Sequence, residues 1–508
     1  MIHALTAAQM RSAEERAVAE HGVLLSDLMA RAGGAVAHEV ARRAPDGEVA
    51  VLAGTGNNGG DGWVAARELA ALGRRVHVFS RVAPEALSGI AADAARAATA
   101  VGVAWTAERT PSADDLSPFA CVVDALLGIG LSGPVRDDLE PWVDAVNGAG
   151  TLVVSADVPT GVDSDTGAVL GPAVAADVTV TFSAPKIGLV QYPGAGYAGE
   201  VVVADVGVPS ELLSPSEAPE IWSDAEYAAL LPLPAPDAHK NQRGRVLVVA
   251  GSGAYPGAAV LAVRGAQRMG AGYVTLAVPA TVARVVQSHL VSGVVVGMPE
   301  NPGHTFASRD ADRILDMVSD YDAVVLGPGL TVARGAVTVV RTLVASLPIP
   351  LVVDADGLNA LVDATELLAS REAPTVITPH PGELGRLLCG SAVDVQANRL
   401  QAASVLGRGT VSCVLKGAGT VTAGQGRAVI NTSGGPALAT AGTGDVLAGM
   451  IGALLATGRS SLEAGALGAF LHGRAGEAAA ELLTPVCVNA EDIPDQIPVA
   501  VAELLGAW

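Results

Sequence analysis

The sequence GTGD at 442–445 combines residues that can bind an anion with one that can move a proton. It opens an apolar stretch with helical character, so its main-chain N–H groups would face a ligand with the positive end of the helix dipole behind them. A carboxylate beside such an anion hole is well placed to take a proton from a substrate hydroxyl. We therefore predict a phosphate site with Asp445 as its base, against the alternative that small residues simply begin a helix.

Further motifs of the same half carry polar groups and glycines. VLKGAGT ends a predicted strand with Lys416 and two glycines, a combination suited to nucleotide phosphates. TPHPGEL places His380 and Glu383 on a Pro-Gly turn at another strand end. Glycines, acidic groups and a helix start come from LGPGL (326–330), VVDADGLN (352–359) and GSGAYPGAAVL (251–261).

A second glycine motif, GTGNNGGDG at 54–62, lies between an apolar run and a helical stretch. It contains G-x-G-x-x-G, the dinucleotide-binding fingerprint. A Rossmann site needs an acidic residue roughly 20 positions later for the ribose, whereas the next predicted strand ends in Ser80 and Arg81. The loop also carries two asparagines and Asp61, whose carboxylate would repel a phosphate. Amide and carboxylate oxygens favour a hard cation or a polar substrate instead.

More oxygens follow the next predicted strands. Asp124 comes after FACVV, Asp157 comes after TLVVSA, and Thr160 lies just beyond in DVPTGVD. The glycine loop GIGLSGP (128–134) comes soon after Asp124. Open α/β sheets place ligands at the carboxyl ends of their strands, so these groups are expected to converge on one site. The alternative is that Asp and Gly merely terminate strands.

Lysine occurs only three times, at Lys186, Lys240 and Lys416, and every other cationic side chain is arginine. Such a bias usually reflects genome composition. The remaining lysines are therefore candidates for places where a compact ammonium group is needed.

The composition excludes several classes of protein. Half of the 508 residues are hydrophobic and 16% are charged, which supports globular cores. The net charge of −21 argues against a nucleic-acid or anionic membrane partner. The four cysteines are scattered without a C-x-x-C pair, which indicates a reducing compartment and no zinc site. We see no signal peptide and no credible membrane span, and expect a cytoplasmic protein.

The elements that must position these residues alternate between strand and helix. Thr6 and Gln9 form a capping-box pattern that opens a first helix. The alternation predicts parallel, doubly wound sheets. In the first half we expect strands within 48–53, 74–80, 119–126, 151–159, 177–185 and 199–209, and helices within 62–72, 84–100 and 136–147. In the second half we expect strands within 245–251, 272–278, 321–329, 349–357, 373–383 and 410–419, and helices near 445–457 and 461–483.

A turn-rich segment with prolines at 232, 234 and 236 separates the two alternations. We predict two domains, residues 1–214 and 223–508, with a Pro-rich linker region at 215–240. The fold class is α/β, with two three-layer α/β/α domains.

Residues 9–211 resemble the N-terminal epimerase domain of the NAD(P)H-hydrate repair family, on the motifs NNGGDG, DALLGIGLSG and DVPTGVD. The resemblance implies a Rossmann-like domain that binds a hydrated nicotinamide nucleotide and a potassium ion. Potassium would be held by Asn58, Asp124 and Thr160, and Asp157 would act in catalysis. The hydrate would be lined by Asn57, Asn58, Gly59, Gly60, Asp61, Gly128, Ile129, Gly130, Leu131, Ser132, Gly133, Pro134 and Asp157.

Residues 223–505 resemble the C-terminal domain of the same family, on GTGD, KGAGT and HPGE. The resemblance implies a ribokinase-like fold and an ADP-dependent dehydratase of (S)-NAD(P)H hydrate that uses magnesium with ADP, and we expect a homo-oligomer. The substrate residues would be Ala258, Gly329, His380, Pro381, Gly382, Glu383 and the catalytic Asp445. The nucleotide residues would be Lys416, Gly417, Ala418, Gly419, Thr420, Gly435, Thr440, Ala441, Gly442, Thr443 and Gly444.

Two other interpretations remain open. The second half could be a vitamin-precursor or sugar kinase with a regulatory N-terminal domain, as GTGD and the strand-end motifs alone would allow. The first half could be a nonenzymatic interaction module, although a scaffold has no need of the oxygens of Asn58, Asp124 and Asp157.

Overall fold

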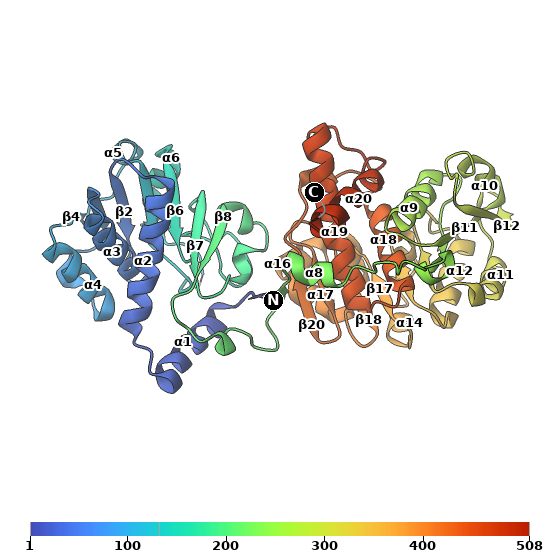
Figure 1. The fold of residues 1–508 in the computed structure, drawn as a ribbon, viewed down its shortest axis with the longest axis horizontal. Helices are drawn as coiled ribbons and strands as arrows, with labels where there is room; N and C mark the ends of the chain where they lie inside the picture. Colours follow the sequence, from blue (N-terminus) through green and yellow to red (C-terminus); the bar gives the residue numbers. More distant parts are fainter. Residues whose placement is uncertain (1, 132, 507–508) are drawn as a thin grey trace. The chain divides into compact units, whose positions relative to one another are not determined.

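The chain divides into two compact units, residues 2–219 and 220–508. A computed structural model describes residues 2–131 and 133–506, and Figure 1 colours it along the sequence. Residues 220–240, part of the predicted linker region, belong to the second unit. In the described part of the chain, no helix is both long and apolar enough to cross a membrane.

The first unit contains a sheet in the order β4-β3-β2-β5-β6-β7-β8, in which all neighbours are parallel. Its strands are β2 (Val49–Ala53), β3 (Val76–Ser80), β4 (Ala104–Ala107), β5 (Cys121–Ala125), β6 (Leu152–Ala156), β7 (Val178–Phe182) and β8 (Glu200–Ala204), after a short β1 (Ile2–His3). Its helices are α1 (Ala7–His21), α2 (Leu25–Arg43), α3 (Asn57–Ala71), α4 (Gly89–Ala100), α5 (Ala113–Leu116), α6 (Glu140–Gly148) and α7 (Ala195–Ala198).

Helices cover both faces of this sheet because the central strands bury both faces. Val49 and Val51 of β2 pack with α1, α2, α3 and α4, whereas Ala50 and Leu52 of the same strand pack with α5 and α6. The chain runs outward from β2 to β4 and then returns to add β5 on the other side of β2. The carboxyl ends of β2 and β5 therefore flank a topological switch point, the usual ligand position in such a sheet.

The second unit has strands in the order β9-β20-β19-β18-β17-β16-β15-β10-β11-β12. They are β9 (Glu220–Ile221), β10 (Arg245–Val249), β11 (Tyr273–Pro279), β12 (Val294–Met298), β15 (Ala323–Leu326), β16 (Leu351–Val353), β17 (Thr375–Ile377), β18 (Val411–Leu415), β19 (Val421–Gly424) and β20 (Arg427–Ile430). A separate hairpin joins β13 (Glu300–Asn301) and β14 (Thr305–Phe306).

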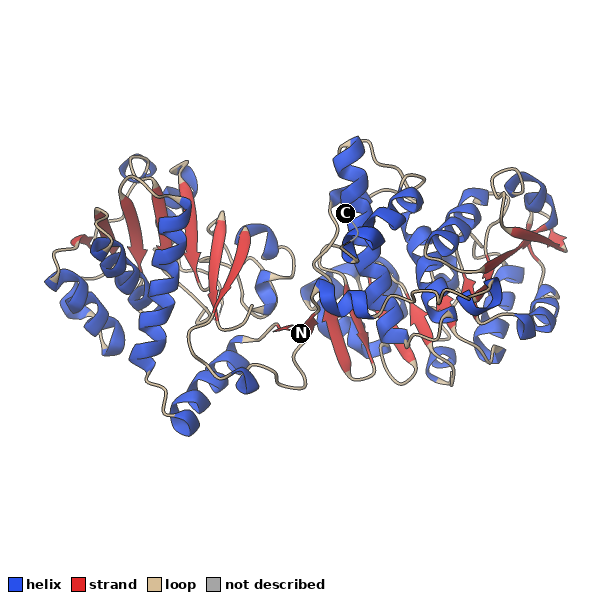
Figure 2. Ribbon diagram, viewed as in Figure 1, coloured by secondary structure: helices blue, strands red, loops and turns tan. Residues whose placement is uncertain are grey.

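The helices of the second unit lie on both faces of its sheet, and Figure 2 shows the strands between the two helical layers. One layer consists of α8 (Asp224–Ala229), α9 (Pro256–Arg268), α10 (Ala280–Val286), α18 (Thr443–Ala456), α19 (Ser461–Leu483) and α20 (Ile493–Leu504). The other contains α11 (Asp310–Met317), α12 (Arg334–Ser346), α13 (Asp356–Asn359), α14 (Glu366–Ala369), α15 (Pro381–Leu387), α16 (Ala392–Ala397) and α17 (Arg399–Leu406).

The predicted fold class is confirmed, since both units are three-layer α/β/α structures with mostly parallel sheets. Strands β18, β19 and β20 are the exception, because they form antiparallel pairs. Among the predicted boundaries, that of the helix expected within 62–72 is wrong, because this helix begins at Asn57, inside the glycine motif.

Candidate functional sites

The glycines of the 54–62 motif allow close backbone packing. Gly54 donates its N–H to the Ala125 carbonyl at 2.9 Å. A Cβ built on Gly54 would come within 1.9 Å of the Leu126 carbonyl oxygen, and one on Gly59 within 2.1 Å of the Gly54 carbonyl oxygen. The first turn of α3 is therefore pressed against the ends of β2 and β5, which gives these glycines a packing reason that does not involve a pyrophosphate.

The three predicted potassium ligands meet around the main chain of Leu127. Asn58 donates its side-chain N–H to the Leu127 carbonyl at 2.9 Å, and the Leu127 N–H donates to the Thr160 hydroxyl at 3.0 Å. That hydroxyl donates to Asp124 Oδ1 at 2.7 Å, and the Thr160 N–H donates to Oδ2 at 2.9 Å. Asp124 is fully buried, and burial raises its pKa although these hydrogen bonds lower it. Asn58 Oδ1 is buried and has no hydrogen-bond partner among the described residues.

Asp157 forms a buried ion pair with a lysine that the composition had singled out. Its φ of +66° places it in the left-handed region directly after β6. Lys186 Nζ lies 2.5 Å from Asp157 Oδ1, and the lysine side chain is only 1% exposed. The ammonium also donates to the Thr181 hydroxyl at 3.0 Å and to the Phe182 carbonyl at 2.9 Å. The pair is thus fixed at the carboxyl ends of β6 and β7.

The negative charge of Asp157 raises the pKa of two further carboxyl groups, those of Asp61 and Glu14. Burial first, and then the negative charges of Asp157 and Glu14, raise the pKa of Asp61 well above its ordinary value. Burial and Asp157 raise the pKa of Glu14 to about 6. Glu14 belongs to α1, and no motif in the sequence pointed to it. Asp61 had been predicted from its motif.

The glycine loop after β5 closes one side of this site. A Cβ on Gly128 would lie 3.1 Å from Asn58 Cγ, so the loop begins against the predicted potassium ligand. Ile129 packs on the core, and its carbonyl accepts a hydrogen bond from Arg11 at 3.3 Å. Ser132, predicted to line the hydrate, lies outside the described residues. The other predicted residues of the loop, Gly130, Leu131, Gly133 and Pro134, follow in the same connection between β5 and α6.

In the second unit, the GTGD sequence forms the N-terminus of α18. Gly442 has φ +98° and precedes the helix, and Asp445 lies in its first turn. The Thr443 hydroxyl donates to the carbonyls of Leu438 and Thr440 at 3.0 and 3.1 Å. His472 of α19 is buried and hydrogen-bonded to the Thr443 backbone, and burial lowers its pKa to about 4. A neutral His472 imidazole therefore holds the main chain of the GTGD sequence through this hydrogen bond.

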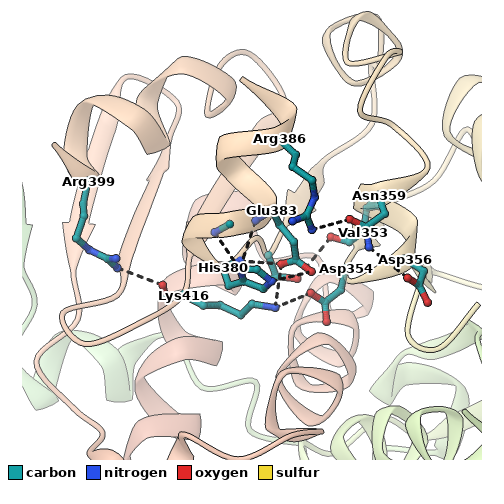
Figure 3. A network of polar contacts seen from close by, with 11 residues as sticks. Val353, Asp354, Asp356, Asn359, His380, Glu383, Arg386, Arg399 and Lys416 are labelled. Carbon is teal, nitrogen blue, oxygen red and sulfur yellow. Dashed lines mark hydrogen bonds and ion pairs between the residues drawn. The ribbon is translucent and has the colours of Figure 1, made fainter. Parts of the chain in front are cut away.

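Lys416 points at a buried aspartate beside this helix terminus (Figure 3). Its Nζ lies 2.8 Å from Asp354 Oδ1 and 3.9 Å from Glu383 Oε2. A Cβ on Gly444 would lie 3.2 Å from the same nitrogen, so the ammonium lies next to the main chain of the GTGD sequence. Burial lowers the pKa of Lys416, but the charges of Asp354, Glu383 and Asp445 outweigh it and raise the pKa overall. The lysine remains charged.

Asp445 lies in a surplus of negative charge. Burial is the largest cause that raises its pKa, to about 7, and the charges of Asp354, Asp356 and Glu383 add to it while Lys416 opposes it. A carboxyl group that titrates near neutral pH is suited to accept a proton during a reaction. The geometry therefore fits the predicted role of Asp445.

His380 and Glu383 form a reciprocal cap on α15. The His380 Nδ1 accepts from the N–H groups of Gly382 and Glu383 at 3.0 and 3.3 Å, and Glu383 Oε2 accepts from the His380 N–H at 2.8 Å. With Nδ1 as an acceptor, a neutral His380 carries its proton on Nε2. Pro381 fills the first helical position. The motif thus has a structural role as well as its predicted contact with substrate.

Two of the predicted substrate residues are neighbours. A Cβ on Gly329, where φ is +64°, would lie 2.9 Å from the Ala258 Cβ. Gly251, at the end of β10, donates its N–H to the Pro328 carbonyl at 2.8 Å. The glycine loops after β10 and β15 therefore pack against each other at the carboxyl edge of the sheet.

The loop after Lys416 is held by an arginine that sequence reasoning missed. Arg399 is buried and donates to the carbonyls of Leu415, Lys416 and Gly419 at 3.0, 3.3 and 3.4 Å. Burial lowers its pKa to about 10. The predicted nucleotide residues occupy two connections: 416–420 lie between β18 and β19, and Gly435 and 440–442 lie between β20 and α18, whose first two residues are Thr443 and Gly444.

The described residues contain no cluster of three or more His, Cys, Asp or Glu side chains arranged to hold a metal ion. In the second unit the acidic groups surround Lys416 instead. In the first unit the oxygens near Asn58 are amide, hydroxyl and main-chain groups with one carboxylate.

Two family models match the chain in separate ranges. The model described as NAD(P)H-hydrate dehydratase matches residues 246–499. The model described as YjeF-related protein N-terminus matches residues 25–188. The two ranges fall in the second and the first unit respectively.

Curated relatives span both units. The bifunctional NAD(P)H-hydrate repair enzyme of Thermofilum pendens is 41% identical over 93% of this chain and 91% of its own length. That of Salinibacter ruber is 40% identical over 99% of this chain and 96% of its own length. A crystal structure of the ADP/ATP-dependent NAD(P)H-hydrate dehydratase of Bacillus subtilis with ATP and Mg²⁺ is 28% identical, covers 56% of this chain and 98% of its own, and has a TM-score of 0.48. The chain therefore belongs to the family of bifunctional NAD(P)H-hydrate repair enzymes.

Proposed function

We propose a division of labour in which the first unit interconverts the R and S epimers of hydrated NADH and NADPH, and the second unit dehydrates the S epimer. The chain is an NAD(P)H-hydrate repair enzyme with an epimerase and a dehydratase domain, as its family membership establishes. A kinase with a regulatory N-terminal half is not favoured, because the relatives share both units under one name.

Hydroxide is a poor leaving group from the reduced pyridine ring. In the proposed dehydration, Asp445 takes the proton of the substrate hydroxyl while the hydroxyl oxygen attacks the β-phosphorus of ADP. AMP leaves, and the hydroxyl becomes a phosphate ester. The ring nitrogen lone pair then expels phosphate, and loss of an adjacent ring proton regenerates NAD(P)H. Lys416 and the N–H groups of 442–444 bind the phosphates, and the pKa of Asp445, about 7, suits a base at neutral pH.

Magnesium, where bound, supplies charge neutralisation for the transferred phosphoryl group. Asp354 and Glu383 are the carboxylates near Lys416 that would hold it together with the nucleotide phosphates. Since the described side chains form no self-sufficient metal cluster, most of its ligands would come from the nucleotide. The residues present fit that arrangement.

We also propose that Asn58, Asp124 and Thr160 bind potassium, with the substrate lined by 57–61, 128–134 and Asp157. The support is Asn58 Oδ1, a buried amide oxygen with no partner among the described residues, on a side chain that is linked through the main chain of Leu127 to Thr160 and Asp124. Hard oxygen donors of this kind suit a hard cation. The cation would orient the substrate through the loop that begins at Gly128.

The observation that carries the dehydratase role is Asp445 at the N-terminus of α18, beside Lys416. Mixed hydrate epimers, incubated with and without ADP, test the whole proposal through the NAD(P)H absorbance. We expect complete conversion with ADP and none without it. A kinase would phosphorylate another substrate and leave the absorbance unchanged, and a nonenzymatic first unit would stop conversion at the S fraction.

The expected homo-oligomer and the expected cytoplasmic location stay predictions. Light scattering of the purified chain would measure its mass in solution and decide the first of them.

A further inference from the structure

Helix α1 forms one wall of the epimerase site. Two residues before the helix, the backbone of Leu5 forms a β-bridge with Lys186, the lysine that is ion-paired with Asp157. One turn into the helix, Arg11 donates to the carbonyl of Ile129 in the glycine loop at 3.3 Å. The helix is therefore attached at two sides of the same site.

Glu14 lies one helical turn after Arg11 and is half-buried. The charged groups that act on it are Asp157 and Lys186 from the sheet edge, Arg11 and Glu15 from its own helix, and Asp61 from α3. Burial is the largest cause that raises its pKa to about 6, followed by Asp157. Glu15, the next residue, is exposed.

We propose that Glu14 is a second catalytic acid–base residue of the epimerase site and works as a pair with Asp157. The inference rests on the proposed epimerase function. Its basis is the position of Glu14 on a helix tied to both the Lys186 segment and the glycine loop, with its carboxyl in the electrostatic field of Asp157.

The chemistry of the hydrate requires two such groups. The epimeric carbon bears a hydroxyl and is bonded to the ring nitrogen, so it loses water when one acid protonates the hydroxyl and the nitrogen lone pair forms a C=N bond. Water then adds to the opposite face and gives its proton to the other carboxylate. The net change is inversion at carbon and the transfer of one proton from one carboxyl to the other, and the reverse reaction exchanges their roles.

The first test compares Glu14→Gln with the matched control Glu15→Gln in the full-length chain. A purified epimer is supplied without ADP, and formation of the other epimer is followed by chromatography. After subtraction of the spontaneous rate, we expect Glu14→Gln to exchange the epimers about 10²- to 10⁴-fold more slowly than the wild type. We expect Glu15→Gln to exchange them at the wild-type rate. Equal rates in the two variants would overturn the proposal.

Dehydration of pure S epimer with ADP in the same variants checks the second unit, because that reaction needs only the second unit, and a thermal melting curve of each variant checks that the first unit, which has its own core, is folded. If the wild-type chain itself does not exchange epimers, the proposed epimerase function fails. If the wild-type chain exchanges them and Glu14→Gln does so equally fast, only the present inference fails.

The pH profile separates an acid–base role from a positioning role. The pair is active when it holds one proton, so wild-type exchange should rise and then fall with pH. The bell-shaped pH profile of exchange should be lost in Glu14→Gln. In Glu14→Asp, which also serves as the test variant if Gln disturbs folding, one limb of the profile should move to lower pH. A bell with both limbs unmoved in Glu14→Asp would mean that Glu14 only positions Asp157 and would overturn the proposal.

Discussion

The two sites use the same pair of residue types in different ways. In the first unit, Lys186 bonds at 2.5 Å to Asp157, the aspartate proposed to act on substrate. In the second unit, Lys416 bonds at 2.8 Å to Asp354 instead. The lysine of the first pair is 1% exposed, whereas that of the second is 20% exposed. The first lysine is enclosed together with its ion pair, whereas the second is partly exposed to solvent.

This difference in exposure fits the reaction that is proposed for each site. Lys416, already charged and partly exposed, lies beside the helix terminus where phosphates are expected. The carboxylates around it leave Asp445 with a pKa of about 7. The proposed epimerase reaction transfers no phosphoryl group, and Lys186 neutralises the buried carboxylate of Asp157. A lysine–aspartate pair therefore indicates function only together with what lies next to it.

The largest effect should come from Asp445→Asn. Removal of the proposed base should lower the rate of dehydration by about 10²- to 10⁴-fold, measured as NAD(P)H formation from pure S epimer. The rate of wild-type dehydration should rise as the pH passes about 7, because the base must be ionised. Epimer exchange should be unchanged in the variant. Dehydration at the wild-type rate would remove Asp445 from the mechanism.

The same substitution should stabilise the second unit at high pH. Burial, followed by Asp354, raises the pKa of Asp445 from 3.8 to about 7, so between these values the folded protein retains a proton that the unfolded chain has released. Stability therefore falls as the pH rises through this window, and Asn avoids the loss. The melting temperature of Asp445→Asn should exceed that of the wild type increasingly from pH 4 to pH 8.

The second effect concerns the other member of the comparison, Asp157→Asn. Asn keeps an acceptor for Lys186, whereas Ala would leave a buried ammonium unpaired, at a cost of about 3–5 kcal/mol. With mixed epimers and ADP, NAD(P)H should form rapidly and stop at the S fraction, since exchange should fall by about 10²- to 10⁴-fold. The exposed Asp144→Asn serves as the control.

Potassium separates Asp157 from Asp124 within this site. Asp124→Ala should behave like the wild type in sodium or lithium, whereas Asp157→Asn should not respond to added potassium. Complete conversion by Asp157→Asn at wild-type speed, after correction for spontaneous exchange, would mean that this aspartate is not needed.

The convergence of Asp124, Asp157 and Thr160 could be predicted because they lie at the carboxyl ends of neighbouring strands, β5 and β6, of one parallel sheet, and such strand ends share an edge. Glu14 could not. It lies on a helix ahead of the sheet, and nothing local in the sequence states which strand ends that helix will cover. Lys186 was singled out by composition, but its bond to Asp157 depends on the path of the chain after β7.

The glycine motif shows a second limit of sequence reasoning. Consecutive glycines and asparagines favour a loop by propensity, yet α3 begins at Asn57. Tertiary packing overrides propensity here, because Gly59 lies too close to the Gly54 carbonyl for any side chain. The strand β4 at the sheet edge was also missed, since its burial is too low to leave a hydrophobic pattern. The helix expected near 461–483 is observed as Ser461–Leu483, and the structure adds that Ser460 and Glu463 form a capping box at its start.

A smaller effect is expected from Lys416→Arg. The charge is kept, but Nζ already lies 3.2 Å from where a Cβ of Gly444 would stand, so a planar guanidinium has no room at the helix terminus. We expect the apparent KM for ADP to rise by about tenfold, equivalent to about 1.4 kcal/mol. Lys240→Arg, at an exposed position of the same unit, is the control. An unchanged KM in Lys416→Arg would make the retention of this lysine accidental.

The smallest effects come from one matched cap in each unit. Thr6 caps α1 and Ser460 caps α19, each in a reciprocal capping box. Replacing either with Ala should cost about 1 kcal/mol, a shift of roughly 2–4 °C in the melting temperature of a unit of this size. Because each unit has its own core, Thr6→Ala should lower the temperature at which epimer exchange is lost and leave dehydration unaffected. Ser460→Ala should do the reverse.

Thr6→Ala should have one further effect. Fraying of α1 also loosens Glu14, so exchange should be lost below the temperature at which the first unit melts. Loss of both activities together in either variant would contradict the independence of the two units.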